Sequence, residues 1–322
     1  MLLQRATRGN VASPTATLRG CMRWLSVMNS SEDMSAPEIV AQGGAALGEG
    51  PVWVAREQAL YWVDIKAPLI WRWLWSSGKT DQWRPPWRIG AIAPRAGGGF
   101  VAATEAGFAW VDLEQGRFEL IGNPEADLPG NRFNDGKVDR SGCFWAGTMD
   151  DAEEAATGAL YRLDPTLTWQ CIDRGYRVTN GPTFSPDGTI LYHTDSALRT
   201  VYRFPVMAGD ALGAREAFLR FDEGEGFPDG MTTDAQGCLW IAFWDGGCVR
   251  RFSPDGAPLQ RLELPARRPT SCTFGGPDLD HLFVTSARVG LDEALLAKQP
   301  LAGSLFVVQP GVRGLEQPLF AA

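Results

Sequence analysis

The sequence predicts an all-β fold, a six-bladed β-propeller, and two observations carry this prediction. A strand-like segment rich in aromatic and β-branched residues recurs six times, and a second strand-like segment follows each copy. Repeats of about 40 to 50 residues that each hold about four short strands are typical of propeller blades. The recurrent segments are Leu60–Asp64, Phe100–Thr104, Phe144–Thr148, Leu191–Asp195, Leu239–Phe243 and Leu282–Ser286.

Turn-forming residues separate the strands of each repeat. Pro186–Gly188 and Asp234–Gly237 contain Asp and Gly, which favour tight hairpin turns. The second strands are Leu69–Trp73, Phe108–Asp112, Ala159–Leu163, Thr200–Phe204, Cys248–Phe252 and Ser304–Val308. Because an open ring of blades would leave strand edges unpaired, we expect Glu38–Ala41 to add a strand to the last blade and close the ring.

The first 35 residues differ in composition from the rest of the chain. They hold four arginines, many Ser and Thr residues, and no acidic residue before Glu32. This composition resembles a transit peptide, but we prefer a disordered extension or a true start at Met28 or Met34. We therefore assign residues 1–35 to a disordered or mis-assigned N-terminal extension, and residues 36–322 to a single propeller domain.

Charge and composition exclude several classes of partner. The net charge is −8 and the Lys and Arg residues form no cluster, so we expect no nucleic-acid partner. No apolar run reaches the roughly 18 residues that a membrane-spanning helix requires, so we expect no membrane partner. The six cysteines form no CxxC pair, which favours buried free thiols in a reducing compartment. We expect a cytoplasmic protein that binds a small molecule or a cation.

One position of the repeat holds a polar residue in four of the six copies. It lies 10 or 11 residues before the recurrent strand, where the chain enters the innermost strand of a blade. In a propeller these positions surround one end of the central channel, so side chains from distant parts of the sequence meet there. The four residues are Glu49, Asn134, Asn180 and Asp229. Each is followed by Gly or by Asp-Gly, which lets the backbone turn tightly.

These side chains are two carboxylates and two amides, which are hard oxygen donors. Such donors suit Ca²⁺, Mg²⁺ or Mn²⁺ and do not exclude Zn²⁺ or Fe²⁺. Carboxylates that are buried close together repel each other unless a cation neutralises them. Asn-Gly and Asp-Gly are also ordinary turn sequences. Because Glu49 is a poor turn former, we prefer a site for one divalent metal ion.

Other catalytic arrangements find less support in the sequence. His193 lies within a predicted strand, which favours a packed core histidine, and His281 follows a turn. The chain contains no Gly-x-Ser-x-Gly sequence for a nucleophilic serine and no phosphate-binding glycine loop.

Six short segments, taken in order, resemble the gluconolactonase family, which includes regucalcin (senescence marker protein) and bacterial aldonolactonases such as xylonolactonase. The resemblance covers roughly residues 38–310 and implies a six-bladed propeller, which agrees with the repeat count. The segments are Leu47–Pro51, Asn131–Lys137, Phe144–Met149, Asn180–Gly181, Phe227–Met231 and Ser271–Gly276.

The resemblance also implies a function, which is hydrolysis of a sugar lactone such as gluconolactone or xylonolactone to the aldonic acid. It implies that Glu49, Asn180 and Asp229 ligate one divalent metal ion. It further implies that Arg132 and Asn134 hold the substrate, and that an acidic residue within 150–154 meets the sugar in some members. We expect Asp229 to be the catalytic base that deprotonates the attacking water.

Three alternatives keep the same fold. The first is a calcium-binding regulatory propeller of the regucalcin type without significant turnover. The second is an interaction propeller whose loops bind proteins and whose channel is inert. The third is a metal-dependent hydrolase that acts on phosphotriesters or bulkier lactones.

Overall fold

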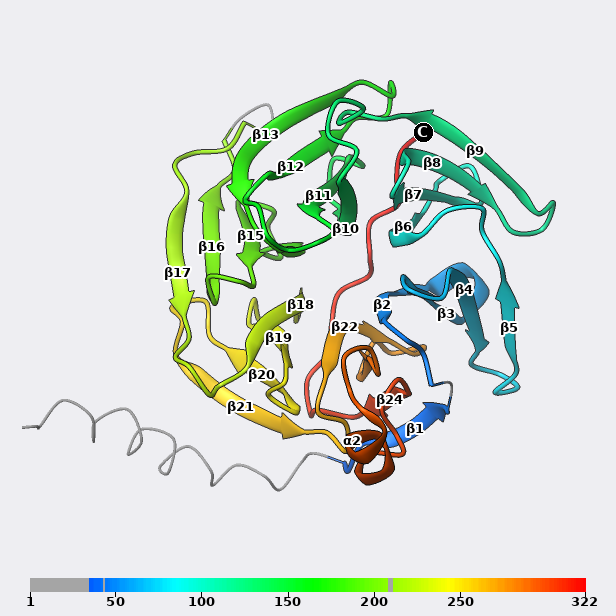
Figure 1. The fold of residues 1–322 in the computed structure, drawn as a ribbon, viewed down its shortest axis with the longest axis vertical. Helices are drawn as coiled ribbons and strands as arrows, with labels where there is room; N and C mark the ends of the chain where they lie inside the picture. Colours follow the sequence, from blue (N-terminus) through cyan, green and yellow to red (C-terminus); the bar gives the residue numbers. More distant parts are fainter. Residues whose placement is uncertain (1–34, 43, 208–210) are drawn as a thin grey trace, which may run out of the picture. The chain divides into compact units, whose positions relative to one another are not determined.

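The structure is a computed structural model that describes residues 35–42, 44–207 and 211–322. These residues form six four-stranded antiparallel sheets around a common centre, which is a six-bladed β-propeller (Figure 1). The predicted fold class is therefore confirmed. The predicted N-terminal extension, residues 1–35, lies outside the described residues apart from Ser35.

The four strands of a blade follow one another in the chain, except in blade 6, which takes one strand from the N-terminal side. Blade 1 contains β2 (Gly48–Val54), β3 (Ala59–Asp64), β4 (Leu69–Leu74) and β5 (Thr80–Trp83). Blade 2 contains β6 (Ile89–Pro94), β7 (Phe100–Thr104), β8 (Gly107–Asp112) and β9 (Arg117–Gly122). Blade 3 contains β10 (Asn131–Val138), β11 (Phe144–Asp150), β12 (Gly158–Leu163) and β13 (Trp169–Tyr176).

The second half of the ring repeats this pattern. Blade 4 contains β14 (Thr179–Phe184), β15 (Ile190–Asp195), β16 (Thr200–Pro205) and β17 (Glu216–Arg220). Blade 5 contains β18 (Phe227–Thr233), β19 (Leu239–Trp244), β20 (Cys248–Phe252) and β21 (Pro258–Glu263). Blade 6 contains β22 (Pro269–Gly275), β23 (His281–Ser286), β24 (Leu305–Val308) and β1 (Glu38–Ala41).

Strand β1 closes the ring, as the sequence predicts. It pairs antiparallel with β24, with Glu38 opposite Val307 and Ile39 opposite Phe306. The last blade therefore combines one strand from before blade 1 with three strands that follow blade 5.

The first strand of each blade lies innermost, and these first strands contact one another from blade to blade around the channel. The recurrent segments of the sequence are the second strands, which are completely or almost completely buried. Aromatic side chains join neighbouring blades: the ring centroids of Tyr61 and Phe100 lie 4.8 Å apart, and those of Phe108 and Phe133 lie 4.5 Å apart. This apolar packing between blades holds the innermost strands at fixed positions around the centre.

An aspartate at the end of two innermost strands fixes the following hairpin. One oxygen of Asp139 accepts from the amide of Cys143 at 2.9 Å, and the other accepts from the indole N–H of Trp145 at 2.6 Å. Asp234 makes the same pair of contacts with Cys238 and Trp240. Each aspartate therefore couples a turn to a fully buried tryptophan of the second strand.

Helical structure is sparse in the part of the chain that the structure describes. The α-helix α2 (Glu293–Lys298) lies between β23 and β24, and Asp292 caps its N-terminus. None of the described helices has the length and apolar character needed to cross a membrane. The five described cysteines are free thiols, and four of them are buried, as the sequence predicts.

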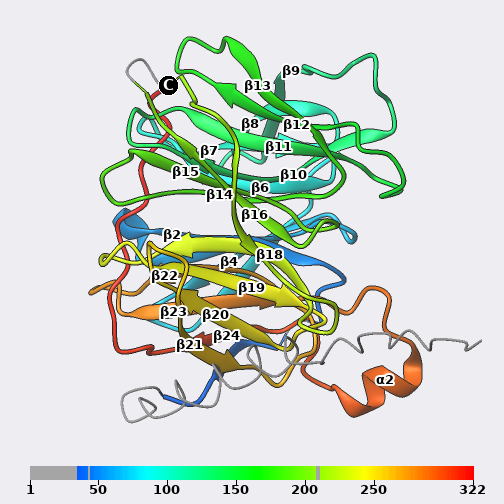
Figure 2. The same ribbon diagram turned by 90° about the vertical axis from the view of Figure 1, so that its left-hand side faces the viewer.

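The C-terminal strap, residues 309–322, crosses the ring at the end where the innermost strands finish (Figure 1). Its backbone bonds to the turns after three innermost strands, through Leu279, Ala235 and Gly142, and to Pro94, the last residue of β6. Figure 2 shows the strap along one face of the propeller and α2 on the other. The strap therefore covers the end of the channel opposite to the starts of the innermost strands.

We predict that the strap is anchored by Phe320, which is 0 % exposed and packs in the core between blades 2 and 3. Phe320→Ala should lower the free energy of unfolding by about 3–5 kcal/mol, because it removes a fully buried aromatic ring. Leu319→Ala is the matched control, since Leu319 is 41 % exposed and should cost well under ~1 kcal/mol. Urea unfolding measures both, and equal effects would contradict the anchoring role.

We predict that buried His193 makes the fold sensitive to acid. Burial and the nearby charge of Arg215 lower the pKa of His193 to about 3. Between pH ~6.5 and 3 the unfolded chain therefore binds a proton that the native ring does not, so stability falls as the pH falls. From pH 7.5 to 5 this loss amounts to about 2 kcal/mol. Urea unfolding of wild type and His193→Gln at pH 7.5 and 5 should show this extra loss in wild type only.

Candidate functional site

All six innermost strands carry an irregularity in pairing near their starts. The register shifts lie between Glu49 and Val52, Ile89 and Ala91, Phe133 and Asp135, Asn180 and Thr183, Pro228 and Met231, and Pro269 and Cys272. A β-bulge locally breaks the strand pairing and turns side chains to a new direction. The four residues at the predicted repeat position each lie at one of these bulges.

Two glycines permit the backbone path at the bulges. Gly50 follows Glu49 with a φ of 51°, and Gly181 follows Asn180 with a φ of 48°. Both angles lie in the left-handed region, which strains residues other than glycine. A Cβ atom on Gly181 would also lie 2.9 Å from the backbone nitrogen of Met231. The predicted tight turn is therefore present after Glu49 and Asn180, whereas Gly136 and Gly230 do not have a positive φ.

The structure brings the predicted residues together, although they come from four blades. Asn134 Nδ2 donates to Asn180 Oδ1 at 3.0 Å and to the Thr179 carbonyl at 2.7 Å. Arg132 Nη1 donates to Asn134 Oδ1 at 2.7 Å. The charge of Asp229 acts on Glu49 and raises the pKa of its carboxyl. All five side chains are buried, with exposures between 3 and 7 %.

The site concentrates negative charge out of contact with water. Burial raises the pKa of Glu49 well above its usual range, and the charge of Asp229 raises it further. Burial likewise raises the pKa of Asp229, and the charge of Asp135 adds to the effect. The Glu49 carboxylate accepts a hydrogen bond from the adjacent amide of Gly50, at 3.0 Å. The carboxylates therefore require a cation before both can be ionised at low cost.

Asp135 is a third buried carboxylate that the sequence analysis did not single out. Its two oxygens accept from the amides of Gly136 at 2.7 Å and Gly181 at 2.6 Å. It therefore fixes the turn that carries Asn180. Asp135 stands between Asn134 and Gly136 in one of the segments that carry the repeat position. An aspartate before a glycine is also an ordinary turn sequence, so the sequence alone did not identify Asp135 as a residue of the site.

The donor set fits a divalent cation. Among residues 35–42, 44–207 and 211–322, no group of three or more His, Cys, Asp and Glu side chains is arranged to hold a metal ion. The predicted set is of a different kind, because its third donor is the amide oxygen of Asn180. Two buried carboxylates and one amide oxygen are the hard ligands that Ca²⁺ and similar ions accept, with water completing the shell.

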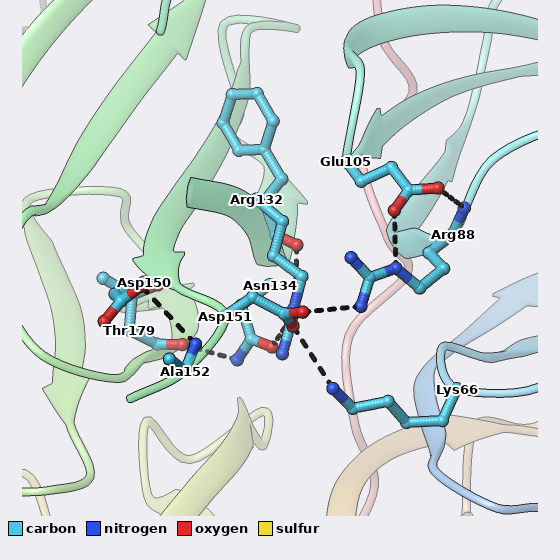
Figure 3. A network of polar contacts seen from close by, with 10 residues as sticks. Lys66, Arg88, Glu105, Arg132, Asn134, Asp150, Asp151, Ala152 and Thr179 are labelled. Atoms are coloured by element: carbon cyan, nitrogen blue, oxygen red, sulfur yellow. Dashed lines mark hydrogen bonds and ion pairs between the residues drawn. The ribbon is translucent and has the colours of Figure 1, made fainter. Parts of the chain in front are cut away.

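Arg132 is held by protein groups on two sides (Figure 3). Its Nε donates to Asp151 at 2.6 Å, and its Nη1 donates to Asn134 and to the Phe133 carbonyl. Asp151 also accepts from Arg88 at 2.8 Å and from Lys66 at 3.2 Å. Partial burial alone would raise the pKa of Asp151, but the hydrogen bonds from Arg88 and Arg132 hold it well below its usual range. Asp151 thus links blades 1, 2 and 3.

The acidic residues of segment 150–154, which begins at the end of β11, have different contacts. Asp150 accepts from the backbone amides of Glu154 and Ala155, both at 3.0 Å, and so stabilises its own loop. Asp151 binds the cations described above. Glu153 is exposed, and its charge acts on both Asp229 and Arg132. Within this segment, Asp151 is therefore the carboxylate that contacts Arg132, and Glu153 is the one whose charge acts on Asp229.

A small internal cavity of about 20 Å³ lies between this site and the C-terminal strap. That volume accommodates about one water molecule. Its lining includes Asp135 and Lys137 from β10, and Gln317 and Pro318 from the strap. Lys137 donates to the Met231 carbonyl at 3.1 Å. Burial lowers the pKa of Lys137, and the charge of Asp135 opposes that effect.

Comparison with known proteins identifies the family. Residues 47–288 match the model of the SMP-30/gluconolactonase/LRE-like region. The chain is 38% identical to a 6-deoxy-6-sulfogluconolactonase from Pseudomonas putida, over 88% of this chain and 98% of that protein. It is 37% identical to regucalcin from Danio rerio, over 86% of this chain and 96% of that protein.

A solved structure shows the same fold. It is a calcium-binding protein, regucalcin, from Agrobacterium tumefaciens, with a TM-score of 0.86 and 30% identity, and the match covers 90% of this chain and 98% of that one. The sequence match extends over most of the propeller and includes the bulged strands that carry the site. This chain belongs to the SMP-30/gluconolactonase/LRE-like family.

Proposed function

We propose that this protein is a metal-dependent lactonase that hydrolyses a sugar lactone to the corresponding aldonic acid. The observation that carries the proposal is the convergence of Glu49, Asn180 and Asp229 beside the buried pair Arg132–Asn134. The lactonase named among the relatives supports the reaction type. The calcium-binding regucalcin structure supports a divalent cation, which in this chain is one ion of Ca²⁺, Mg²⁺, Mn²⁺, Zn²⁺ or Fe²⁺.

Glu49, Asn180 and Asp229 would hold the metal ion through three oxygen atoms. Bound there, a divalent ion supplies Lewis-acid polarisation of the lactone carbonyl and a lower pKa for a coordinated water. With only three protein ligands, such an ion would remain accessible to water and to the substrate. Asp229 is the base that orients the attacking water and accepts its proton. Burial raises the pKa of this carboxyl above its ordinary value, which makes it a stronger base than an exposed aspartate. Attack at the carbonyl carbon breaks the bond to the ring oxygen, which takes up a proton to give the hydroxy acid.

The remaining polar residues orient the sugar. Both N–H groups of Asn134 are used by Thr179 and Asn180, so its remaining capacity is to accept from a sugar hydroxyl through Oδ1. The described residues supply acceptors to Nε and Nη1 of Arg132, which leaves Nη2 to contact the substrate. Glu153 is the acidic residue that we assign to a hydroxyl of the sugar, because its charge acts on Asp229 and Arg132.

A second candidate is a calcium-binding regulatory propeller without significant turnover. The relatives named regucalcin favour it. The two functions are separated by assaying lactone opening with gluconolactone and xylonolactone on chelator-treated protein, with single metals added back and spontaneous opening subtracted. Activity restored by one metal supports the lactonase. A metal-dependent rise in melting temperature without turnover supports the regulatory protein.

We predict that Asp229→Ala reduces kcat by about 10²–10⁴-fold, because it removes both a metal ligand and the base. The metal-free variant should melt at a temperature no lower than wild type, since the change also removes a buried, repelled carboxylate. Asp255→Ala, at an exposed turn of blade 5, is the control and should keep full activity. If Asp229→Ala turned over the lactone at the wild-type rate, Asp229 would be neither the base nor a required metal ligand.

We predict that Glu153→Gln raises KM for the preferred lactone several-fold and changes kcat less, because it weakens a contact to the sugar rather than the attack on the carbonyl. The neighbouring exposed residue gives the matched control, and Glu154→Gln should leave both constants unchanged. Steady-state kinetics on the two variants decide the matter. A larger effect from Glu154→Gln would transfer the role to that residue.

A further inference from the structure

The amide of Asn180 is hydrogen-bonded on both sides, and one of its partners is a serine that has no part in the proposed chemistry. On one side Asn134 Nδ2 donates to Asn180 Oδ1 at 3.0 Å. On the other, Asn180 Nδ2 donates to the hydroxyl of Ser196 at 2.9 Å. Ser196 directly follows β15 and is 7 % exposed. Its own amide donates to the Val178 carbonyl at 2.9 Å, which fixes its backbone.

The hydrogen bonds of Ser196 have only one consistent direction. Its Oγ lies 2.6 Å from the carbonyl of Pro228, and a carbonyl can only accept. The single hydroxyl proton is therefore used there. Ser196 can then only accept from Asn180, and the Asn180 amide must turn its NH₂ group toward Ser196 and its oxygen away.

The hydrogen bonds on the Arg132 side impose the same orientation on the Asn180 amide. Arg132 can only donate, and its Nη1 bonds to Asn134 Oδ1 at 2.7 Å. Asn134 must therefore present its NH₂ group to Asn180, which must present its oxygen in return. A donor-only guanidinium at one end and an acceptor-only carbonyl at the other thus fix which atom of Asn180 is the oxygen.

We propose that Ser196 is a positioning residue that orients Asn180 as an oxygen ligand of the divalent metal. This inference rests on the proposed function, because it requires a metal ion at Glu49, Asn180 and Asp229. The orientation matters because an amide turned by 180° would direct its NH₂ group at the cation. Groups that hold metal ligands in place typically contribute 10- to 100-fold to metal affinity.

The same hydroxyl connects two of the ligand-bearing strands. Pro228 immediately precedes Asp229 on β18, and Asn180 lies on β14 of the neighbouring blade. One side chain of the β15–β16 loop therefore sets the position of a ligand in blade 4 and of the backbone beside a ligand in blade 5. Loss of the hydroxyl would leave an NH₂ group and a buried carbonyl without their partner.

The test measures metal binding directly, by calorimetric titration of the chelator-treated protein with Ca²⁺ and with Mn²⁺. Ser196→Ala removes the hydroxyl, whereas Ser196→Thr keeps it. Ser185→Ala is the matched control, because Ser185 lies in the same blade and its hydroxyl bonds to Asp187 in an exposed turn. Melting temperatures of the metal-free proteins separate loss of ligand orientation from loss of the fold.

We expect Ser196→Ala to weaken metal affinity by about 10–100-fold, while Ser196→Thr and Ser185→Ala stay within about threefold of wild type. The metal-free Ser196→Ala protein should unfold cooperatively at a melting temperature only a few degrees below that of wild type, because two buried groups lose a partner, and Ser196→Thr and Ser185→Ala should melt close to wild type. Wild-type affinity in Ser196→Ala would overturn the inference while leaving the proposed function intact. Absence of metal binding by the wild-type protein would overturn both. If Ser196→Ala does not fold, Ser196→Cys replaces it, and wild-type affinity there would overturn the inference.

Discussion

The antiparallel pairing of β1 with β24 is the constraint on which the rest of the molecule depends. Each blade packs mainly on its two neighbours, so a ring without this pairing would expose an unpaired edge and an unpacked apolar face at its two ends. Closure fixes the six innermost strands around one centre. Glu49 and Asp229, which are distant in sequence, then lie in the same site, where the charge of Asp229 acts on Glu49. The site follows from the closed ring rather than from any local sequence segment.

The chemistry of the site is a balance between burial and charge. Apolar packing between blades shields Glu49, Asp135 and Asp229 from water, and this shielding raises the pKa of each of them. On the other side of Asn134, the cations of blades 1, 2 and 3 meet at Asp151. A negatively charged pocket thus lies beside a neutralised ion-pair network, and Asn134 connects the two through Arg132.

The sequence predicts those features that the repeat imposes. Glu49, Asn134, Asn180 and Asp229 could be located from the sequence because they share one repeat position, and the structure places a bulge there. Ring closure by Glu38–Ala41 was predictable because an unpaired edge is unfavourable. Ser196 and Glu153 lie in loops between the second and third strands of their blades, where no periodicity applies. Their positions depend on the conformation of the loop, which local sequence does not specify.

The C-terminal strap lies across the end of the channel where the innermost strands finish. Gln317 and Pro318 of the strap line a cavity of about 20 Å³, which accommodates about one water molecule, beside Asp135 and Lys137 of β10. For the proposed reaction, we expect the incoming lactone and the departing acid to use the opposite end, where the innermost strands start. Acid that stays bound at that end would exclude the next substrate, so its residence time would determine how strongly accumulated product slows turnover.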